Sequence, residues 1–341
     1  NLGSVNLVNH LHSRGIDYKK LKKTISVAMR MLDNVIDLNF YPTEEARRSN
    51  LQHRPVGLGM MGLHDVLHKL DINFDSDEAV KFNDELFEQY SLAAISASSK
   101  LAKERGAYES FEGSLWSQNI FPVDSYNNLM RYRGESEDAK ESADWASCRE
   151  HVKEFGMRNS NVMAIAPTAT IGYINGVEQS IEPNFSTIFV YENKSGNSYI
   201  VNEHFVNDMK DRDLWNLENI ELIKSVDGDL SLVNGSIPED IKNKYKTAFD
   251  RDMFKLIECN AVRQKWIDQA ISFNLYNKTT SMKYLNDVYM ACWEAGLKTT
   301  YYLRNRAASK IEKSTNDSVD QEAAACSIEA MRNGEICESC Q

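Results

Sequence analysis

The sequence predicts an α/β protein in which helices alternate with buried strands. Two segments read as a helix that ends at a glycine and is followed within a few residues by an apolar strand: Gly156 precedes 162–166, and Gly296 precedes 299–303. Helix, glycine, short connection and buried strand is typical of a sheet or barrel covered by helices. A third observation is the start of the chain, where residues 1–7 resemble the interior of a strand rather than a frayed terminus. We therefore expect a fragment, or one piece of a split protein.

Composition excludes several classes of protein. The 341 residues suffice for a sizeable core, and the net charge of −11 argues against a nucleic-acid-binding face, which needs clustered Lys and Arg. No apolar run approaches the roughly 20 residues that span a bilayer, and no signal peptide is visible. The six cysteines are scattered except for one terminal pair, so they do not form a disulfide framework. We expect a cytoplasmic protein.

The helices follow from apolar spacing and from the residues that begin and end them. Asp17 caps a helix whose apolar residues recur three and four positions apart, and Tyr41-Pro42 ends this segment. A second helix begins at Ser76 and is stopped by Gly106. Three further helices are predicted, over 142–155, 250–270 and 282–295.

The remaining segments are more polar. Residues 190–250 predict loops, a partly exposed helix and a hairpin at about 191–201. From about 305 the chain is rich in Ser, Glu, Asp, Ala and Lys, without a sustained apolar face. This composition predicts a mobile tail. The predicted organisation is one domain over 1–304 and a flexible tail over 305–341.

Residues 57–62 satisfy the pattern G-x-G-x-x-G, which also occurs in dinucleotide-binding folds. The context does not fit that fold, because only Pro55-Val56 precedes the motif as a strand. There is also no acidic residue at the end of a second strand about 20 residues on. A close approach of a strand to a helix is the simpler interpretation.

The segment Pro167-Thr168-Ala169-Thr170-Ile171 follows a predicted buried strand. Small residues leave backbone N–H groups open, so a helix or turn that starts here could bind phosphate. The alternative is an ordinary turn capped by a threonine, and the residues alone favour this alternative. Polar groups near other strand ends, in 158–160 and 180–183, make a binding site more plausible.

Cys337 and Cys340 form a C-x-x-C pair near the end of the tail. Such a pair can be half of a zinc site, but no second pair stands nearby and all seven histidines lie at or before position 204. A redox dithiol is the better interpretation, and no metal site is expected. Cys326 has no assigned role. The other three cysteines fall in helical patterns and are expected to be core thiols: Cys148, Cys259 and Cys292.

The adjacent pair Tyr301-Tyr302 lies in a predicted strand. Taken alone, the pair is explained by the preference of tyrosine for strands, and neighbours in a strand point to opposite faces. Two adjacent phenols can also pass a radical from one ring to the next. Together with a terminal dithiol, the pair indicates radical chemistry that consumes two thiol electrons per turnover.

Seven motifs in order give the chain a resemblance to the C-terminal half of the large (alpha) subunit of class I ribonucleotide reductase. The resemblance covers residues 1–306 and the C-x-x-C tail. The motifs are NLGSVNL (1–7), RPVGLG (54–59), RNS (158–160), APTAT (166–170), SIEP (180–183), RQK (263–265) and GLKTTYYLR (296–304).

The resemblance implies a fold and an activity. The expected fold is half of a ten-stranded α/β barrel with surrounding helices, in which residues 57–62 are a barrel strand. The expected activity is the radical-based reduction of ribonucleoside diphosphates to deoxyribonucleotides. Thr168, Ala169, Thr170 and Ile171 are then expected to hold the substrate diphosphate at a helix N-terminus.

The resemblance also implies roles for the tyrosines and the tail. Tyr302, on the outer side, would pass the radical from the small subunit to Tyr301, nearer the substrate. Cys337 and Cys340 would reduce the active-site disulfide and be reduced in turn by thioredoxin or glutaredoxin. The implied partners are the N-terminal half of the large subunit and the small (beta) radical subunit. No cofactor is expected to bind directly, because the metal and tyrosyl radical reside in the small subunit. Neither DNA nor a membrane is an expected partner.

The chain departs from the family pattern in what it lacks. In the family, one reducing cysteine immediately precedes the Asn1-Leu2 motif, and the loop with the thiyl cysteine lies further upstream. The chain alone is therefore expected to be inactive. Two alternatives stay open: a fragment of an adenosylcobalamin-dependent class II reductase, which needs no tyrosine relay, and a non-catalytic barrel fragment that acts as an assembly module.

Overall fold

The computed structural model describes residues 1–305 apart from 14, 136, 142–144 and 194–195. The predicted redox tail, with Cys326, Cys337 and Cys340, lies outside the described residues. Among the described helices, none is long and apolar enough to cross a membrane.

Two parallel strand pairs and two single parallel bridges join five segments into a row, which forms the framework of the fold. Strand β1 (Leu2–Asn6) pairs in parallel with β4 (Gly57–Met61), with Leu2 opposite Gly57. The row continues past β4, because the Leu58 N–H donates to the Val162 carbonyl across 2.9 Å and the Ala164 N–H donates to the Leu58 carbonyl across 3.1 Å. The predicted strand at 162–166 is thus the third segment, although only single parallel bridges mark it.

The fourth and fifth segments complete the row. A parallel bridge joins Ile165 to Ile271, and the chain then enters β7 (Leu275–Asn277). Strand β7 pairs in parallel with β8 (Leu303–Asn305), with Leu275 opposite Leu303. Five segments therefore lie side by side in chain order and run in one direction, which is the arrangement expected for half of a ten-stranded barrel.

Glycines in β4 allow the third segment to approach closely. A Cβ on Gly59 would lie 2.6 Å from the Ala164 carbonyl oxygen, and one on Gly57 would lie 2.9 Å from the Ala164 Cβ. Gly62, with a φ of 77°, forms the turn into α3 (Leu63–Lys69). The interpretation of 57–62 as a barrel strand is confirmed. The predicted close approach is made to a neighbouring strand rather than to a helix.

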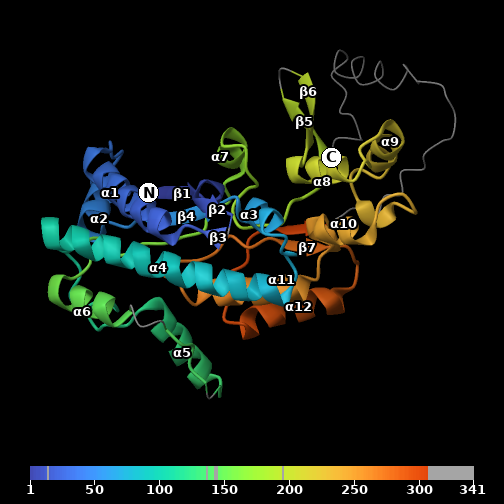
Figure 1. Cartoon of the computed structure of the whole chain (residues 1–341). Coiled ribbons are helices and arrows are strands. Elements are labelled where there is room, and N and C mark those ends of the chain that lie inside the picture. Colours follow the sequence, from blue (N-terminus) through green and yellow to red (C-terminus); the bar gives the residue numbers. More distant parts are fainter. Residues whose placement is uncertain (14, 136, 142–144, 194–195, 306–341) are drawn as a thin grey trace, which may run out of the picture. The chain divides into compact units, whose positions relative to one another are not determined.

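Helices α1 and α4 are the longest in the described part of the chain, and they begin as predicted. Helix α1 (Tyr18–Leu38) is capped by Asp17, whose carboxylate accepts the Lys20 N–H. Helix α4 (Asp77–Arg105) is capped by the Ser76 hydroxyl and ends at Gly106. Helix α4 packs against α1, α6 and α11 (Figure 1), so it supports the strand row along much of its length.

The other described helices include three that the sequence predicted, near 142–155, 250–270 and 282–295, and several short ones that apolar periodicity did not reveal. The helices are α2 (Glu44–His53), α5 (Pro122–Tyr132), α6 (Trp145–Phe155), α7 (Ala169–Ile174), α8 (Glu203–Asp211), α9 (Leu217–Ser225), α10 (Glu239–Lys244), α11 (Met253–Gln264) and α12 (Met282–Glu294). Short 3-10 turns occupy Leu7–His10, Leu230–Leu232 and Ala248–Asp250, and a small antiparallel pair joins β2 (Leu11–His12) to β3 (Gly15–Ile16).

The prediction of a hairpin is confirmed, since β5 (Ile188–Asn193) pairs antiparallel with β6 (Gly196–Val201). Two other predictions are wrong in extent. The helix expected over 250–270 is α11, which ends at Gln264 because the residues after it turn to join the strand row. The strand expected over 299–303 begins at Leu303, although the Tyr301 N–H already bonds to the Phe273 carbonyl across 2.8 Å.

Two hydrophobic clusters stabilise the described residues. The larger cluster lies between the strand row and the long helices and includes Trp145 stacked on Trp266, with ring centroids 5.9 Å apart. The smaller cluster lies within 188–245, around Phe205 and Tyr245. The polar segment 190–250 therefore has an apolar core of its own.

Candidate functional site

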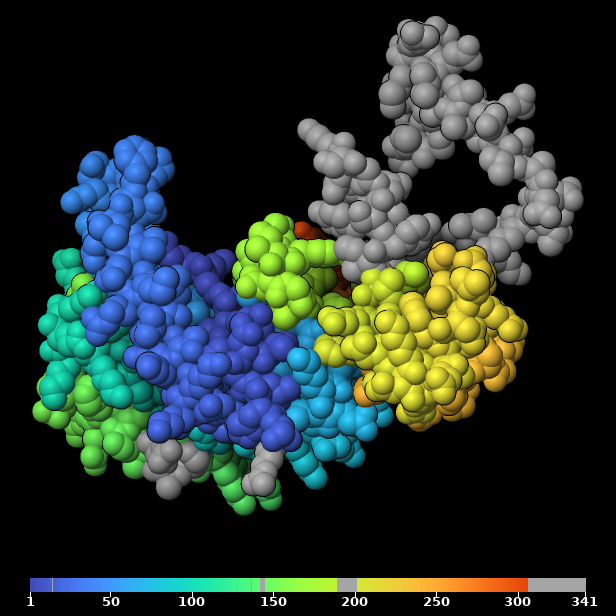
Figure 2. Space-filling view, turned by 45° about the horizontal axis from the view of Figure 1, so that its top comes forward, coloured from blue at the N-terminus to red at the C-terminus, as the bar shows by residue number. Residues whose placement is uncertain are grey.

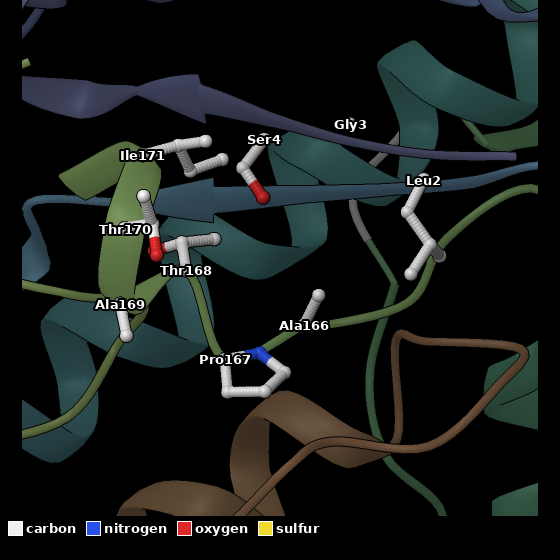
Figure 3. A pocket seen from close by; sticks show the side chains of 9 residues that line it. All are labelled: Leu2, Gly3, Ser4, Ala166, Pro167, Thr168, Ala169, Thr170 and Ile171. Atoms are coloured by element: carbon white, nitrogen blue, oxygen red, sulfur yellow. The ribbon is translucent and has the colours of Figure 1, made fainter. Parts of the chain in front are cut away.

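A pocket lies between β1 and α7, with a cavity volume of about 260 Å³. It brings the predicted phosphate-binding residues together with the start of the chain. Figure 3 shows Ser4 on β1 across the pocket from the residues of α7, and Figure 2 shows the green α7 region beside the blue N-terminal residues. The lining residues are all uncharged: Leu2, Gly3, Ser4, Ala166, Pro167, Thr168, Ala169, Thr170 and Ile171.

The first turn of α7 presents backbone donors at this pocket. The Ala169 N–H bonds to the Pro167 carbonyl across 2.8 Å, and the Gly172 N–H bonds to the Thr168 carbonyl across 2.8 Å. Within the described part of the chain, the N–H groups of Thr170 and Ile171 have no hydrogen-bond acceptor, as expected for the first turn of a helix. These two amides are the donors that the pocket can offer to an anion.

Thr168 stands at the N-cap position of α7, but a cap by its side chain, as the threonine-capped turn would have it, is not formed. Instead, the buried Thr168 hydroxyl accepts the Ser180 N–H across 2.7 Å. Ser180 has a φ of 53°, so its backbone turns sharply at this point. The Thr168 side chain thereby ties the pocket to the segment 180–183.

Glu182 in that segment is a buried carboxylate that accepts two hydrogen bonds. It accepts the Asn274 N–H across 3.2 Å and the Tyr276 hydroxyl across 3.0 Å. Burial raises the pKa of Glu182 to about 7, against these hydrogen bonds and the positive charges of Arg263 and Arg304. Sequence reasoning singled out Glu182 as polar but missed Tyr276, which stands in a segment without a motif.

The polar residues at 158–160 have a structural role in this part of the chain. Asn159 is buried and donates to the Arg54 carbonyl across 3.0 Å. The Arg158 guanidinium contacts the buried Asp33 carboxylate, which also contacts Arg54 and Arg105. These ion pairs join α1 to the end of α4. They explain the polar cluster without a ligand.

Tyr301 and Tyr302 lie next to each other just before β8. Their ring centroids are 3.9 Å apart, and the Tyr301 hydroxyl donates to the Tyr302 hydroxyl across 3.1 Å. Both side chains are partly exposed, at 42% and 52%. The expectation that the two rings point to opposite faces is wrong, because β8 begins only at Leu303 and its alternation does not reach the pair.

Electrostatics distinguish the pair from ordinary surface tyrosines. The hydrogen bond with Tyr302 raises the pKa of the Tyr301 phenol, while the positive charge of Arg304 acts to lower it. The Arg304 guanidinium lies 5.3 Å from the centre of the Tyr302 ring. Arg304 is the last residue of the motif at 296–304, but no sequence pattern indicated a role for it.

The cysteines of the described residues are buried, as predicted. Cys148, Cys259 and Cys292 have free thiols inside the fold. Burial raises the pKa of all three thiols, that of Cys292 to about 11. A raised pKa keeps the thiol protonated and therefore poorly nucleophilic. These residues thus behave as core side chains.

Comparison with known proteins decides the family. A sequence model described as "Ribonucleotide reductase, barrel domain" matches residues 1–303. The chain belongs to this ribonucleotide reductase family. The resemblance derived from the seven motifs is confirmed, as is the α/β barrel fold.

Named relatives agree with this assignment. The chain is 49% identical over 320 residues to a ribonucleoside-diphosphate reductase subunit alpha from Chlamydia pneumoniae, with 93% of this chain and 31% of the relative covered. It is 39% identical to the Helicobacter pylori (strain 26695) subunit alpha, with 93% and 36% covered. It is 37% identical to the Schizosaccharomyces pombe large chain, with 94% and 38% covered. The chain thus spans about a third of the length of these curated relatives.

Proposed function

We propose that this chain is the part of a class I ribonucleoside-diphosphate reductase large subunit that holds the substrate diphosphate and relays the radical. The reaction is the reduction of a ribonucleoside diphosphate to the deoxyribonucleotide. The proposal rests chiefly on the contact between the hydroxyls of Tyr301 and Tyr302, 3.1 Å apart. Membership of the reductase family and the neutral pocket at α7 support it.

The pocket suits the diphosphate group of a substrate rather than a whole nucleotide. Its volume of about 260 Å³ lies below the roughly 300–1,000 Å³ of pockets that enclose drug-sized ligands. The N–H groups of Thr170 and Ile171, at the positive end of a helix, are suited to phosphate oxygens. Uncharged donors bind phosphate less tightly than a lysine or arginine would. Weaker binding of the diphosphate allows the product to dissociate after the reaction.

The tyrosine pair is arranged for the transfer of a hydrogen atom. In the proposed step, a radical on the Tyr302 oxygen takes the hydrogen atom of the Tyr301 hydroxyl. The Tyr301 O–H bond breaks, a Tyr302 O–H bond forms, and the radical moves to Tyr301. The two phenol oxygens already lie within hydrogen-bond distance of each other, 3.1 Å apart. This contact favours a class I enzyme over a cobalamin-dependent class II enzyme, which needs no such relay.

The partners follow from the same proposal. The remaining part of the large subunit supplies the thiyl cysteine, and the small subunit supplies the metal-generated tyrosyl radical. Cys337 and Cys340 form the dithiol that carries electrons from thioredoxin or glutaredoxin. The compartment is the cytoplasm, where thiols stay reduced. No cofactor binds directly to this chain.

The test of the relay uses the full-length large subunit with its small subunit. Phenylalanine keeps the ring and its packing but lacks the hydroxyl hydrogen. Tyr301→Phe and Tyr302→Phe are each expected to abolish turnover while the two subunits still associate. Substantial turnover by either variant would remove the relay role, and a non-catalytic assembly module would then explain the barrel fragment better.

The dithiol is tested separately. Cys337→Ser and Cys340→Ser should each block repeated turnover driven by thioredoxin or glutaredoxin. The same variants should complete a first turnover when reduced beforehand, and a small dithiol should restore cycling. Loss of the first turnover, or stoichiometric zinc binding by the wild-type tail, would contradict the shuttle.

A further inference from the structure

Arg304 is a positively charged residue that contacts the tyrosine pair. Its guanidinium lies 5.3 Å from the centre of the Tyr302 ring, within the range of a cation–π contact. Arg304 lies in β8, two residues after Tyr302 in the chain. The backbone of the pair is fixed at the same time, since the Leu275 N–H donates to the Tyr302 carbonyl across 2.9 Å.

The contact with Arg304 matters because little else fixes the orientation of the two tyrosine rings. Both side chains are partly exposed, and the hydrogen bond between their hydroxyls holds only the tips of the rings. Solvent would let each ring take other rotamers, and each alternative rotamer would break the 3.1 Å contact. A planar guanidinium against the Tyr302 ring limits this freedom, because it stacks on the face of the ring.

The position of Arg304 is itself determined by β7. Arg304 stands opposite Tyr276 in the parallel register of β7 and β8. Tyr276 donates to the buried Glu182 carboxylate, and the charges of Glu182 and Arg304 attract each other. The ionisable groups that interact with the Arg304 guanidinium include the phenols of Tyr276, Tyr301 and Tyr302 and the Glu182 carboxylate.

We propose that Arg304 is a positioning residue of the tyrosine pair: its guanidinium holds the Tyr302 ring against Tyr301 and places a positive charge beside both phenols. This inference rests on the relay proposed above. A nearby cation disfavours a ring that loses its electron first and becomes positively charged. Loss of the electron together with the hydroxyl proton leaves the ring neutral and avoids this cost. Arg304 thus favours transfer of a whole hydrogen atom between the phenols.

The experiment uses the full-length large subunit with a fluorotyrosine in place of Tyr301. Fluorine NMR over a pH series reports the pKa of this phenol and needs no turnover. Arg304→Gln removes the charge, so the pKa of the phenol at 301 is expected to rise, whereas Arg304→Lys should keep it nearer to that of the parent protein. Lys103→Gln is the matched control, because it removes a cation that lies 4.3 Å from the centre of the Phe155 ring. The control should leave the pKa unchanged.

Turnover with the small subunit gives the second readout. Arg304→Gln should lower kcat severalfold with little change in KM, and Arg304→Lys should recover part of the loss. An unchanged pKa at 301 in Arg304→Gln would overturn the inference, even if Tyr301→Phe abolishes turnover. If Tyr301→Phe instead keeps full turnover while Arg304→Gln shifts the pKa, the relay fails and the electrostatic contact stands. A kcat for Arg304→Gln equal to that of the parent would also overturn the positioning role.

Discussion

The Tyr276 hydroxyl donates a hydrogen bond to the Glu182 carboxylate across 3.0 Å, and both side chains are buried in the fold. This contact links the segment after the pocket to β7, the strand that pairs with β8. Burial raises the pKa of Glu182 to about 7 from a usual value of 4.5, although the hydrogen bond with Tyr276 acts to lower it. The raised pKa has a consequence for stability.

Glu182 should make the folded state less stable as pH rises from about 4.5 to about 7. Over this range the folded protein holds the Glu182 proton more tightly than the unfolded chain, so loss of the proton favours unfolding. The effect is at most about 3 kcal/mol, from a difference of about 2.5 pKa units. Glu182→Gln cannot ionise, so its free energy of unfolding should vary less over this pH range. Urea unfolding at a series of pH values measures the difference, and parallel curves for the two proteins would contradict the assignment.

Asp33→Asn is expected to destabilise the protein by about 3 kcal/mol. The fully buried Asp33 carboxylate contacts Arg54 at 2.8 Å, Arg105 at 3.0 Å and Arg158 at 3.3 Å. Its loss leaves the buried Arg54 with less compensating charge, and breaking a buried ion pair typically costs about 3–5 kcal/mol. Asp37 remains bound to Arg54 and moderates the loss.

A surface pair on the same helix is the control for that substitution. Arg30 on α1 binds Glu104 across 2.8 Å, with both side chains well exposed. Arg30→Gln should cost at most about 1 kcal/mol, as exposed pairs usually do. Chemical denaturation of both variants gives the comparison. Equal losses would show that the cluster around Asp33 does not act as a buried network.

Gly59→Ala should destabilise the strand row by about 1–3 kcal/mol. The added Cβ would lie 2.6 Å from the Ala164 carbonyl oxygen, and backbone cannot move aside as a flexible side chain can. Gly3→Ala in the paired strand β1 is the matched control, since its Cβ would meet only side chains, the nearest 3.5 Å away. Thermal unfolding should therefore separate the two variants. Similar transitions would mean that the third segment is less closely packed on β4.

Local features of the fold were predictable from sequence, while long-range pairing was not. Ser76 and Gly106 bound α4 because caps act within one turn. By contrast, α11 stops at Gln264 because the following residues join the row: Asp268 accepts the Val162 N–H across 2.7 Å, and Ile271 pairs with Ile165. No periodicity encodes a partner a hundred positions away, so the helix was predicted to run too far.

The candidate site also combines features that the sequence predicts with features that depend on long-range packing. The resemblance to the reductase family assigned the diphosphate to Thr168–Ile171, and the fold gathers these residues at one pocket. The contribution of Ser4 could not be foreseen, because it depends on where β1 lies relative to α7. The Thr168 hydroxyl was misjudged for a similar reason, since its partner, the Ser180 N–H, lies twelve residues later in the chain.

Thr170→Pro should weaken diphosphate binding about 10–100-fold, while Thr170→Ala should change it little. Proline removes the Thr170 N–H, and a hydrogen bond to a charged group is worth about 1.5–3 kcal/mol. Alanine keeps that N–H and removes only the hydroxyl. Ala169 is less suitable for this test, because its N–H already bonds to the Pro167 carbonyl across 2.8 Å.

The measurement is calorimetric titration of the full-length large subunit with a ribonucleoside diphosphate, compared with the parent nucleoside. Both Thr170 variants should bind the nucleoside as the wild type does, because it lacks the group that the amide contacts. Circular dichroism must show that the proline variant keeps its fold, since proline also restricts Ala169 before it. If the folded Thr170→Pro variant binds the diphosphate as tightly as Thr170→Ala, the backbone amides of α7 do not hold the phosphates.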